Sequence, residues 1–139
     1  LCYGNPETRD RITSAIADYC DAHSEIDYLH FWLADEALNQ CECEKCAEKR
    51  PSDYYVDMLN MLDEKLSLAG IDTKIVFLIY VDLLFAPEKE KFKNPDRFVL
   101  MFAPINRWYS EFYDEIDCMD LFDGNDLRER IIIFSVSCN

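Results

Sequence analysis

The pattern of apolar and polar positions predicts two helices in the first half of the chain. Apolar residues recur three and four positions apart within Pro6–Ala22 and within Ser52–Ala69, which is the spacing of one buried helix face. Asn5 precedes the first helix as a capping residue, Pro51 precedes the second, and Gly70 follows it as a C-terminal stop. Both segments therefore carry their own start or stop signals.

Three other segments are almost continuously apolar and lack helical spacing. They predict strands over Tyr28–Ala34, Lys74–Phe85 and Phe98–Phe102. Continuous apolarity predicts burial on both faces, as in a parallel sheet. Helices and long connections separate the strands, so the expected fold class is α/β, with parallel strands and crossover helices.

The pattern weakens in the last quarter of the chain. Trp108 to Ile116 has the spacing of an irregular helix, and Ile131–Val136 has the composition of a final strand. A length of 139 residues predicts a single α/β unit. The chain starts at Leu1 without a methionine or a signal-like segment, so we expect a piece of a longer protein.

The charge of the chain limits its partners. There are 28 Asp and Glu residues against 14 Lys and Arg, which gives a formal net charge of -14. Such a surface repels nucleic acids and anionic lipids, because both need basic residues for neutralisation. No apolar run approaches the roughly 20 residues of a membrane span. A neutral or cationic ligand is the expected partner.

The densest group of chemically active residues follows the first predicted strand. That strand stops at Asp35 and Glu36, and three cysteines come within the next ten residues. In α/β enzymes the loops after the carboxyl ends of the strands form the functional face. The alternative is that the two acids only end a strand and begin a solvated loop, since acids are frequent throughout this chain.

Cys41, Cys43 and Cys46 have C-x-C-x-x-C spacing. Three thiolates from one loop predict a structural Zn²⁺ site, with a fourth ligand supplied by Cys20, Cys118 or His30. A disulfide between two of the three, or reduced packing thiols, are the alternatives. We expect ordinary packing for the scattered cysteines: Cys2, Cys20, Cys118 and Cys138.

Several residues near the predicted strand ends are candidates for contacts with a sugar. Trp32, Tyr80 and Trp108 are aromatic and suit the C–H faces of pyranose rings, with packing in the core as the alternative. Asp82 is the single acid in an apolar segment, where a polar group is costly unless it has a partner. The alternative for Asp82 is a solvated acid beyond the end of the strand. We expect His30 to be a core histidine.

Three blocks of the sequence resemble a bacterial family long described as a domain of unknown function, part of which is classed as glycoside hydrolase family 163. The blocks are YLHFWLADEALNQCECEKC (Tyr28 to Cys46), YVDLLFAP (Tyr80 to Pro87) and NPDRFVLMFAPINRWYS (Asn94 to Ser110). The similarity runs from about Cys2 to Tyr113 and leaves residues 114–139 unplaced.

The resemblance implies an exported enzyme with a (β/α)8 barrel that cleaves complex N-glycans as an endo-β-N-acetylglucosaminidase. It also implies substrate-assisted catalysis, which requires no cofactor and in which the substrate's acetamide oxygen is the nucleophile. By the same resemblance, Asp35 holds the acetamide and Glu36 is the general acid and base.

A full barrel needs about 250 residues, so the resemblance makes this chain either a barrel fragment or a truncated open reading frame. The uncovered apolar faces and open sheet edges of such a fragment predict either a large exposed apolar patch or its burial by self-association. The alternatives to a glycosidase are a non-catalytic carbohydrate-binding domain and a metal-stapled interaction domain.

Overall fold

The computed structural model describes residues 1–33, 38 and 40–103. Two helices and three strands form its framework, and three short 3-10 turns lie between them. The elements in chain order are α1 (Pro6–Ala22), β1 (Tyr28–Phe31), η1 (Cys46–Glu48), α2 (Pro51–Leu68), β2 (Lys74–Ile79), η2 (Val81–Leu84), η3 (Pro95–Arg97) and β3 (Phe98–Phe102).

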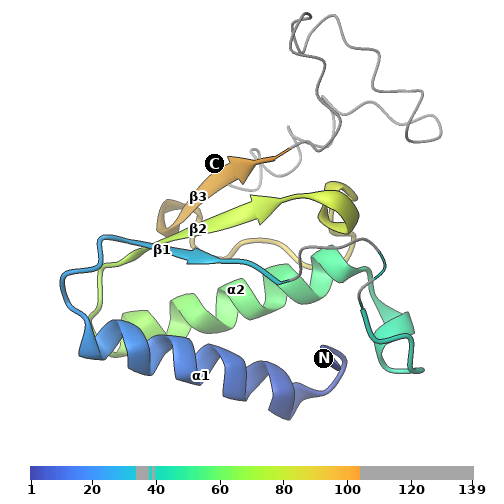
Figure 1. Cartoon of the computed structure of the whole chain (residues 1–139), viewed down its shortest axis with the longest axis horizontal. Coiled ribbons are helices and arrows are strands. Elements are labelled where there is room, and N and C mark those ends of the chain that lie inside the picture. The colour runs from blue at the N-terminus through green and yellow to red at the C-terminus, as the bar shows by residue number, and fades with distance from the viewer. Residues whose placement is uncertain (34–37, 39, 104–139) are drawn as a thin grey trace, which may run out of the picture.

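The three strands form one parallel sheet in the order β1-β2-β3. Helix α2 is the crossover from β1 to β2, and α1 packs beside α2. Both helices lie on the same side of the sheet (Figure 1). The prediction of parallel strands with crossover helices is confirmed for this part of the chain.

The helices start where their capping residues predict. The side chain of Asn5 accepts a hydrogen bond from the backbone N–H of Glu7 at 3.1 Å, and Pro6 opens α1. At the start of α2, the buried carboxylate of Asp53 accepts from the N–H of Arg50 at 3.2 Å. The observed bounds of α1 are those predicted, and α2 begins and ends one residue earlier than predicted.

The core lies between the helices and the sheet. Helix α2 contributes Leu59, Leu62 and Leu66, and β2 contributes Ile75 and Phe77, all with no exposed surface. Each large aliphatic side chain buried in this way stabilises the fold by about 1.5–3 kcal/mol. The amphipathic pattern of α2 therefore docks it on the central strand.

A buried tyrosine ties α2 to two strands. The Tyr55 hydroxyl accepts from the N–H of Leu78 at 3.0 Å and donates to the carbonyl of Phe31. Burial raises the pKa of Tyr55, so this hydroxyl keeps its proton to donate. The contacts fix the ends of β1 and β2 against one helix.

A buried ion pair fixes the start of β3. Arg97 Nε lies 2.7 Å from Asp63 Oδ1, and both side chains are about nine-tenths buried. Arg97 also donates to the carbonyls of Ile71 and Thr73, at 2.8 and 2.9 Å. One guanidinium thus joins α2, the loop before β2 and the turn before β3.

Strand β1 is less buried than predicted. Leu29 and Phe31 face the helices, whereas Tyr28 is 61% exposed and His30 is also exposed. For β1 the prediction of burial on both faces was wrong, as was that of a core His30, because β1 is an edge strand of this sheet and the helices cover one face. For the central strand β2 the prediction is confirmed, since Ile75 to Ile79 are all buried. Ala34, the last residue predicted for this strand, lies outside the described residues.

Strand β2 is shorter than predicted. It ends at Ile79, and residues 81–84 form the 3-10 turn η2 instead of extending the strand to Phe85. Val81 has a φ of 47°, a left-handed conformation that breaks the extended backbone. Apolar composition alone does not separate a strand from a buried turn that follows it.

Helices α1 and α2 do not meet the requirements of a membrane span. Within the described ranges, neither helix combines the length and the apolarity needed to cross a bilayer.

Candidate functional site

Four cysteines meet at one end of the molecule. The sulfur atoms of Cys2, Cys41, Cys43 and Cys46 all lie within 4.8 Å of one another. Cys2 Sγ is 3.7 Å from Cys43 Sγ and 3.6 Å from Cys46 Sγ. In Figure 1 the N-terminus lies at the same end of the molecule as the loop between β1 and α2 that carries the other three cysteines.

Backbone hydrogen bonds shape the cysteine loop. The N–H groups of Cys46 and Ala47 donate to the carbonyl of Cys43 at 2.9 and 3.0 Å, which closes a tight turn. The Tyr54 hydroxyl of α2 donates to the carbonyl of Lys45 and fastens the tip of this turn. The turn brings Cys43 and Cys46 to the same side of the loop.

The N-terminal segment approaches the loop closely at Gly4. Its N–H donates to Cys46 Sγ at 3.1 Å. A Cβ atom on Gly4 would lie 2.7 Å from the carbonyl carbon of Lys45 and 2.8 Å from the nitrogen of Cys46. Real Cβ atoms essentially never come so near a backbone atom, so only glycine fits here.

Two of the four thiols, Cys43 and Cys46, lie in opposite electrostatic environments. The backbone N–H of Cys46 and neighbouring thiols favour the charged form of Cys43 and lower its pKa to about 7. Burial disfavours the charged form of Cys46 and raises its pKa to about 12. Cys43 is the exposed member of the cluster, and the other three are partly buried.

The identity of the fourth cysteine corrects the sequence prediction. Among the residues that the structure describes it is Cys2, which the sequence suggested was a packing thiol, and not Cys20 or His30. Cys20 is 1% exposed in the core, as expected of a packing thiol. Cys118 and Cys138 lie outside the described residues. All five cysteines in the described part of the chain are free thiols.

Asp82 lies at the carboxyl edge of the sheet and has a partner. It follows β2 in the turn η2, and its Oδ2 accepts from the backbone N–H of Leu38 at 2.6 Å. Leu38 belongs to the loop after β1 and has a φ of 58°. The strand has therefore ended before Asp82, as the alternative interpretation held, yet the acid joins the segments that follow two neighbouring strands.

The predicted aromatic residues differ in their positions. Trp32 directly follows β1 and is 52% exposed, and its ring contacts that of His30 with centroids 6.2 Å apart. Tyr80 is half-buried between β2 and η2. The exposure of Trp32 rules out a core role for it.

The remaining predicted site residues are Asp35, Glu36 and Trp108. All three lie outside the described residues. Of the candidates near the strand ends, the structure therefore places Trp32, Tyr80 and Asp82, and it adds Leu38 as the partner of Asp82.

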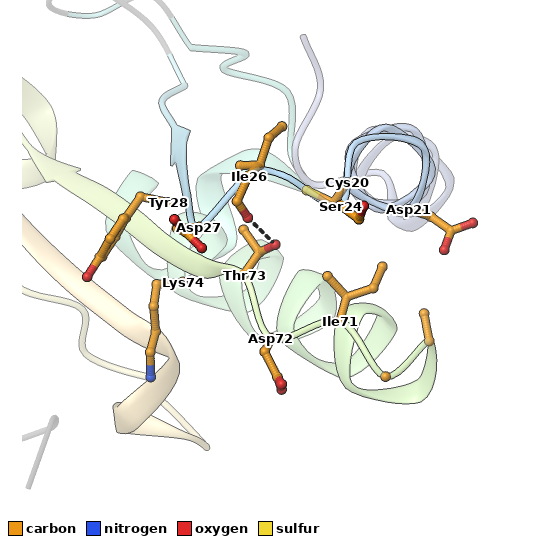
Figure 2. Close-up of a pocket in the computed structure, with 12 residues that line it drawn as sticks. Cys20, Asp21, Ser24, Ile26, Asp27, Tyr28, Ile71, Asp72, Thr73 and Lys74 are labelled. Atoms are coloured by element: carbon orange, nitrogen blue, oxygen red, sulfur yellow. Dashed lines mark hydrogen bonds between the residues drawn. The ribbon is translucent and has the colours of Figure 1, made fainter.

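A pocket lies at the opposite edge of the sheet, around the amino ends of β1 and β2 (Figure 2). Its lining includes Asp27, Asp72 and Lys74, and the Thr73 hydroxyl donates to the carbonyl of Ile26 at 2.8 Å. In parallel α/β folds the amino ends of the strands serve stability, and function concentrates at the carboxyl ends. This pocket is therefore separate from the predicted site.

Comparisons with protein-family models, with curated proteins and with solved structures find no match to this chain. The fold and the two groups of residues above are therefore the basis for a function.

Proposed function

We propose that this chain is part of a glycoside hydrolase of the (β/α)8 barrel class, which cleaves N-acetylglucosamine-containing N-glycans by substrate-assisted catalysis. The observation that carries the proposal is a parallel sheet in consecutive strand order, with an acid at its carboxyl edge that holds the loop after the preceding strand.

The topology favours a barrel over a doubly wound sheet. In doubly wound folds the strand order reverses and helices cover both faces of the sheet. In a barrel the strands follow one another in order and all helices lie outside. The order β1-β2-β3, with α1 and α2 on one side, is the arrangement of a barrel segment (Figure 1). The 139 residues would then supply three or four of eight strands.

The hydrogen bond from Leu38 to Asp82 supports a site at this edge. Asp35 and Glu36 precede Leu38 by three and two positions in the sequence. Their loop follows β1 on one side and is held by Asp82 on the other. Asp82 is thus a positioning residue for Leu38, which follows Glu36 by two positions in the sequence.

The ligand chemistry follows from charge and from Trp32. An acidic chain with a formal charge of -14 accepts a neutral sugar more easily than a phosphate. The exposed indole of Trp32 offers an apolar wall beside the strand end, on which a pyranose ring can pack. Both features suit a glycan and disfavour a polyanion.

The paired acids then divide the reaction between them. Asp35 accepts a hydrogen bond from the acetamide N–H, while the acetamide oxygen attacks the anomeric carbon and Glu36 protonates the departing glycosidic oxygen. The resulting oxazolinium ion is opened by water, whose proton returns to Glu36. This mechanism requires no metal or organic cofactor.

The test is incubation of a complex-type N-glycoprotein with the protein encoded by the complete reading frame that contains this chain. We expect mass spectrometry to find one N-acetylglucosamine left on each asparagine and the rest of the glycan released. Binding of the glycan without release would instead support a non-catalytic carbohydrate-binding domain. Neither binding nor release would reject both functions.

A further inference from the structure

We propose that Cys2, Cys41, Cys43 and Cys46 together bind one Zn²⁺ ion that fastens the N-terminus to the loop before α2. This inference is independent of the glycosidase proposal. It starts from the convergence of four thiols from two distant parts of the sequence within 4.8 Å.

The sulfur positions suit a single tetrahedral ion. With a Zn–S bond of about 2.3 Å, the sulfur atoms at the corners of a tetrahedron are about 3.8 Å apart. Cys2 Sγ lies 3.7 Å from Cys43 Sγ and 3.6 Å from Cys46 Sγ. These separations are much longer than the roughly 2.05 Å of a disulfide bond. The 4.8 Å that encloses all four sulfur atoms is also too short for an iron–sulfur cluster, in which the four thiolates are shared among two or more iron atoms.

The surroundings of the thiols do not suit ordinary packing. Residues 42–45 are all exposed, as are residues 47 and 48, so the loop is not part of the described core. Cys20 shows the contrast, because it is 1% exposed within the core cluster of α1, α2 and the sheet. Four thiols that gather at the surface need another reason to converge, and a shared metal ion supplies it.

The backbone supports a thiolate ligand set. The Gly4 N–H points to Cys46 Sγ at 3.1 Å, and such outer hydrogen bonds orient and stabilise metal-bound sulfur. The tight turn from Cys43 to Cys46 presents two ligands together. The charged side chains of the segment give no net help, since Glu42, Glu44 and Glu48 outnumber Lys45 and Lys49, so the support comes from the backbone.

Zinc fits this site better than other common ions. Thiolates are soft ligands that select zinc or iron over magnesium, calcium and manganese, and closed tetrahedral sites with four cysteine ligands are typical of structural zinc. The site links Cys2, just before α1, to the loop between β1 and α2. It therefore closes a long loop around α1 and β1 and restricts the unfolded chain.

The test uses the full 139-residue chain purified under reducing conditions. We expect elemental analysis and native mass spectrometry to find one zinc ion per chain. Cys2→Ser should weaken zinc binding by at least about 100-fold, since it removes a ligand directly. Cys20→Ala is the matched control and should keep one zinc ion. Replacement of zinc by Co²⁺ should give the charge-transfer bands of four thiolates in the control and fewer in Cys2→Ser.

A second measurement on the wild-type chain avoids dependence on the folding of any variant. Alkylation followed by peptide mapping should show all four cluster cysteines protected, including the exposed Cys43, and chelator should expose them together. Metal-free protein, iron in place of zinc, or rapid alkylation of Cys43 before chelation would overturn the proposal. A Cys2→Ser variant that folds and binds zinc as tightly as wild type would overturn it as well.

Discussion

At the scale of single residues, the structure depends on a few atoms at close contacts. Gly4 is the clearest case, because the N-terminal segment passes the cysteine loop with no room for a side chain. Gly70 is required for a different reason, since it ends α2 with a φ of 71° and has open space around it. Gly4 is therefore required because there is no room for a side chain, and Gly70 because of its backbone conformation.

We predict that Gly4→Ala moves the N-terminal segment away from the loop, weakens zinc binding by roughly 10-fold and lowers the melting temperature. Isothermal titration with zinc and thermal unfolding measure the two effects. Gly70→Ala is the control, because its left-handed backbone costs about 1 kcal/mol or more without touching the cysteines. Equal zinc affinity in Gly4→Ala and wild type would contradict the close approach.

At the scale of elements, polar contacts between residues far apart in the sequence join helices to loops. The carboxylate of Asp53 shows this, since its Oδ1 accepts from the N–H groups of Lys89 and Glu90 at 2.6 and 3.0 Å. It thereby ties the start of α2 to the loop after β2. In the second half of α2, the ion pair of Asp63 with Arg97 ties the helix to the turn before β3.

We predict that Asp63→Ala lowers the free energy of unfolding by about 3 kcal/mol, because it leaves the buried guanidinium of Arg97 without its charge partner. Chemical denaturation monitored by circular dichroism gives this quantity. Asp10→Ala is the control, since the Asp10 pair with Lys65 is more exposed and should change stability by less than about 1 kcal/mol. Similar losses in the two variants would contradict a special role for the buried pair.

Features that depend on neighbouring residues were predicted from the sequence, and features that depend on distant contacts were not. The helix bounds and the bounds of β3 follow from spacing and capping within a few residues, so they were predicted to within one residue. The end of β2 at Ile79 depends on the left-handed Val81, which apolar composition does not reveal. The contact of Cys2 with Cys46 and that of Asp82 with Leu38 join residues more than forty positions apart, beyond the reach of any local pattern.

At the scale of the whole molecule, the described sheet has one face turned away from its helices. Alternation along the strands gives this face Tyr28, His30, Val76, Leu78 and Val99, whereas their neighbours pack in the core. On this face Val76 and Leu78 of the central strand are buried, whereas Tyr28 on β1 is 61% and Val99 on β3 is 39% exposed. In a complete barrel this face would point inward and be covered by the remaining strands.

The isolated 139-residue chain is therefore predicted to self-associate through this face while its charge keeps the assemblies soluble. Light scattering over a concentration series should show a mass that rises above that of one chain. Val99→Lys should reduce the association. Leu68→Lys should not, although Leu68 is 84% exposed, because it lies on α2 and not on the sheet. A strictly monomeric wild-type chain would contradict the barrel-segment account.

The most direct test of the central claim is the rate of N-glycan cleavage by the complete reading frame with single acids replaced. Glu36→Gln is predicted to lose at least about 10²-fold in rate, as expected for removal of a general acid, and Asp35→Asn is predicted to lose a similar amount. Glu64→Gln, which changes an exposed acid on α2, should cleave at the wild-type rate. Turnover near that of wild type in both Glu36→Gln and Asp35→Asn would contradict the account.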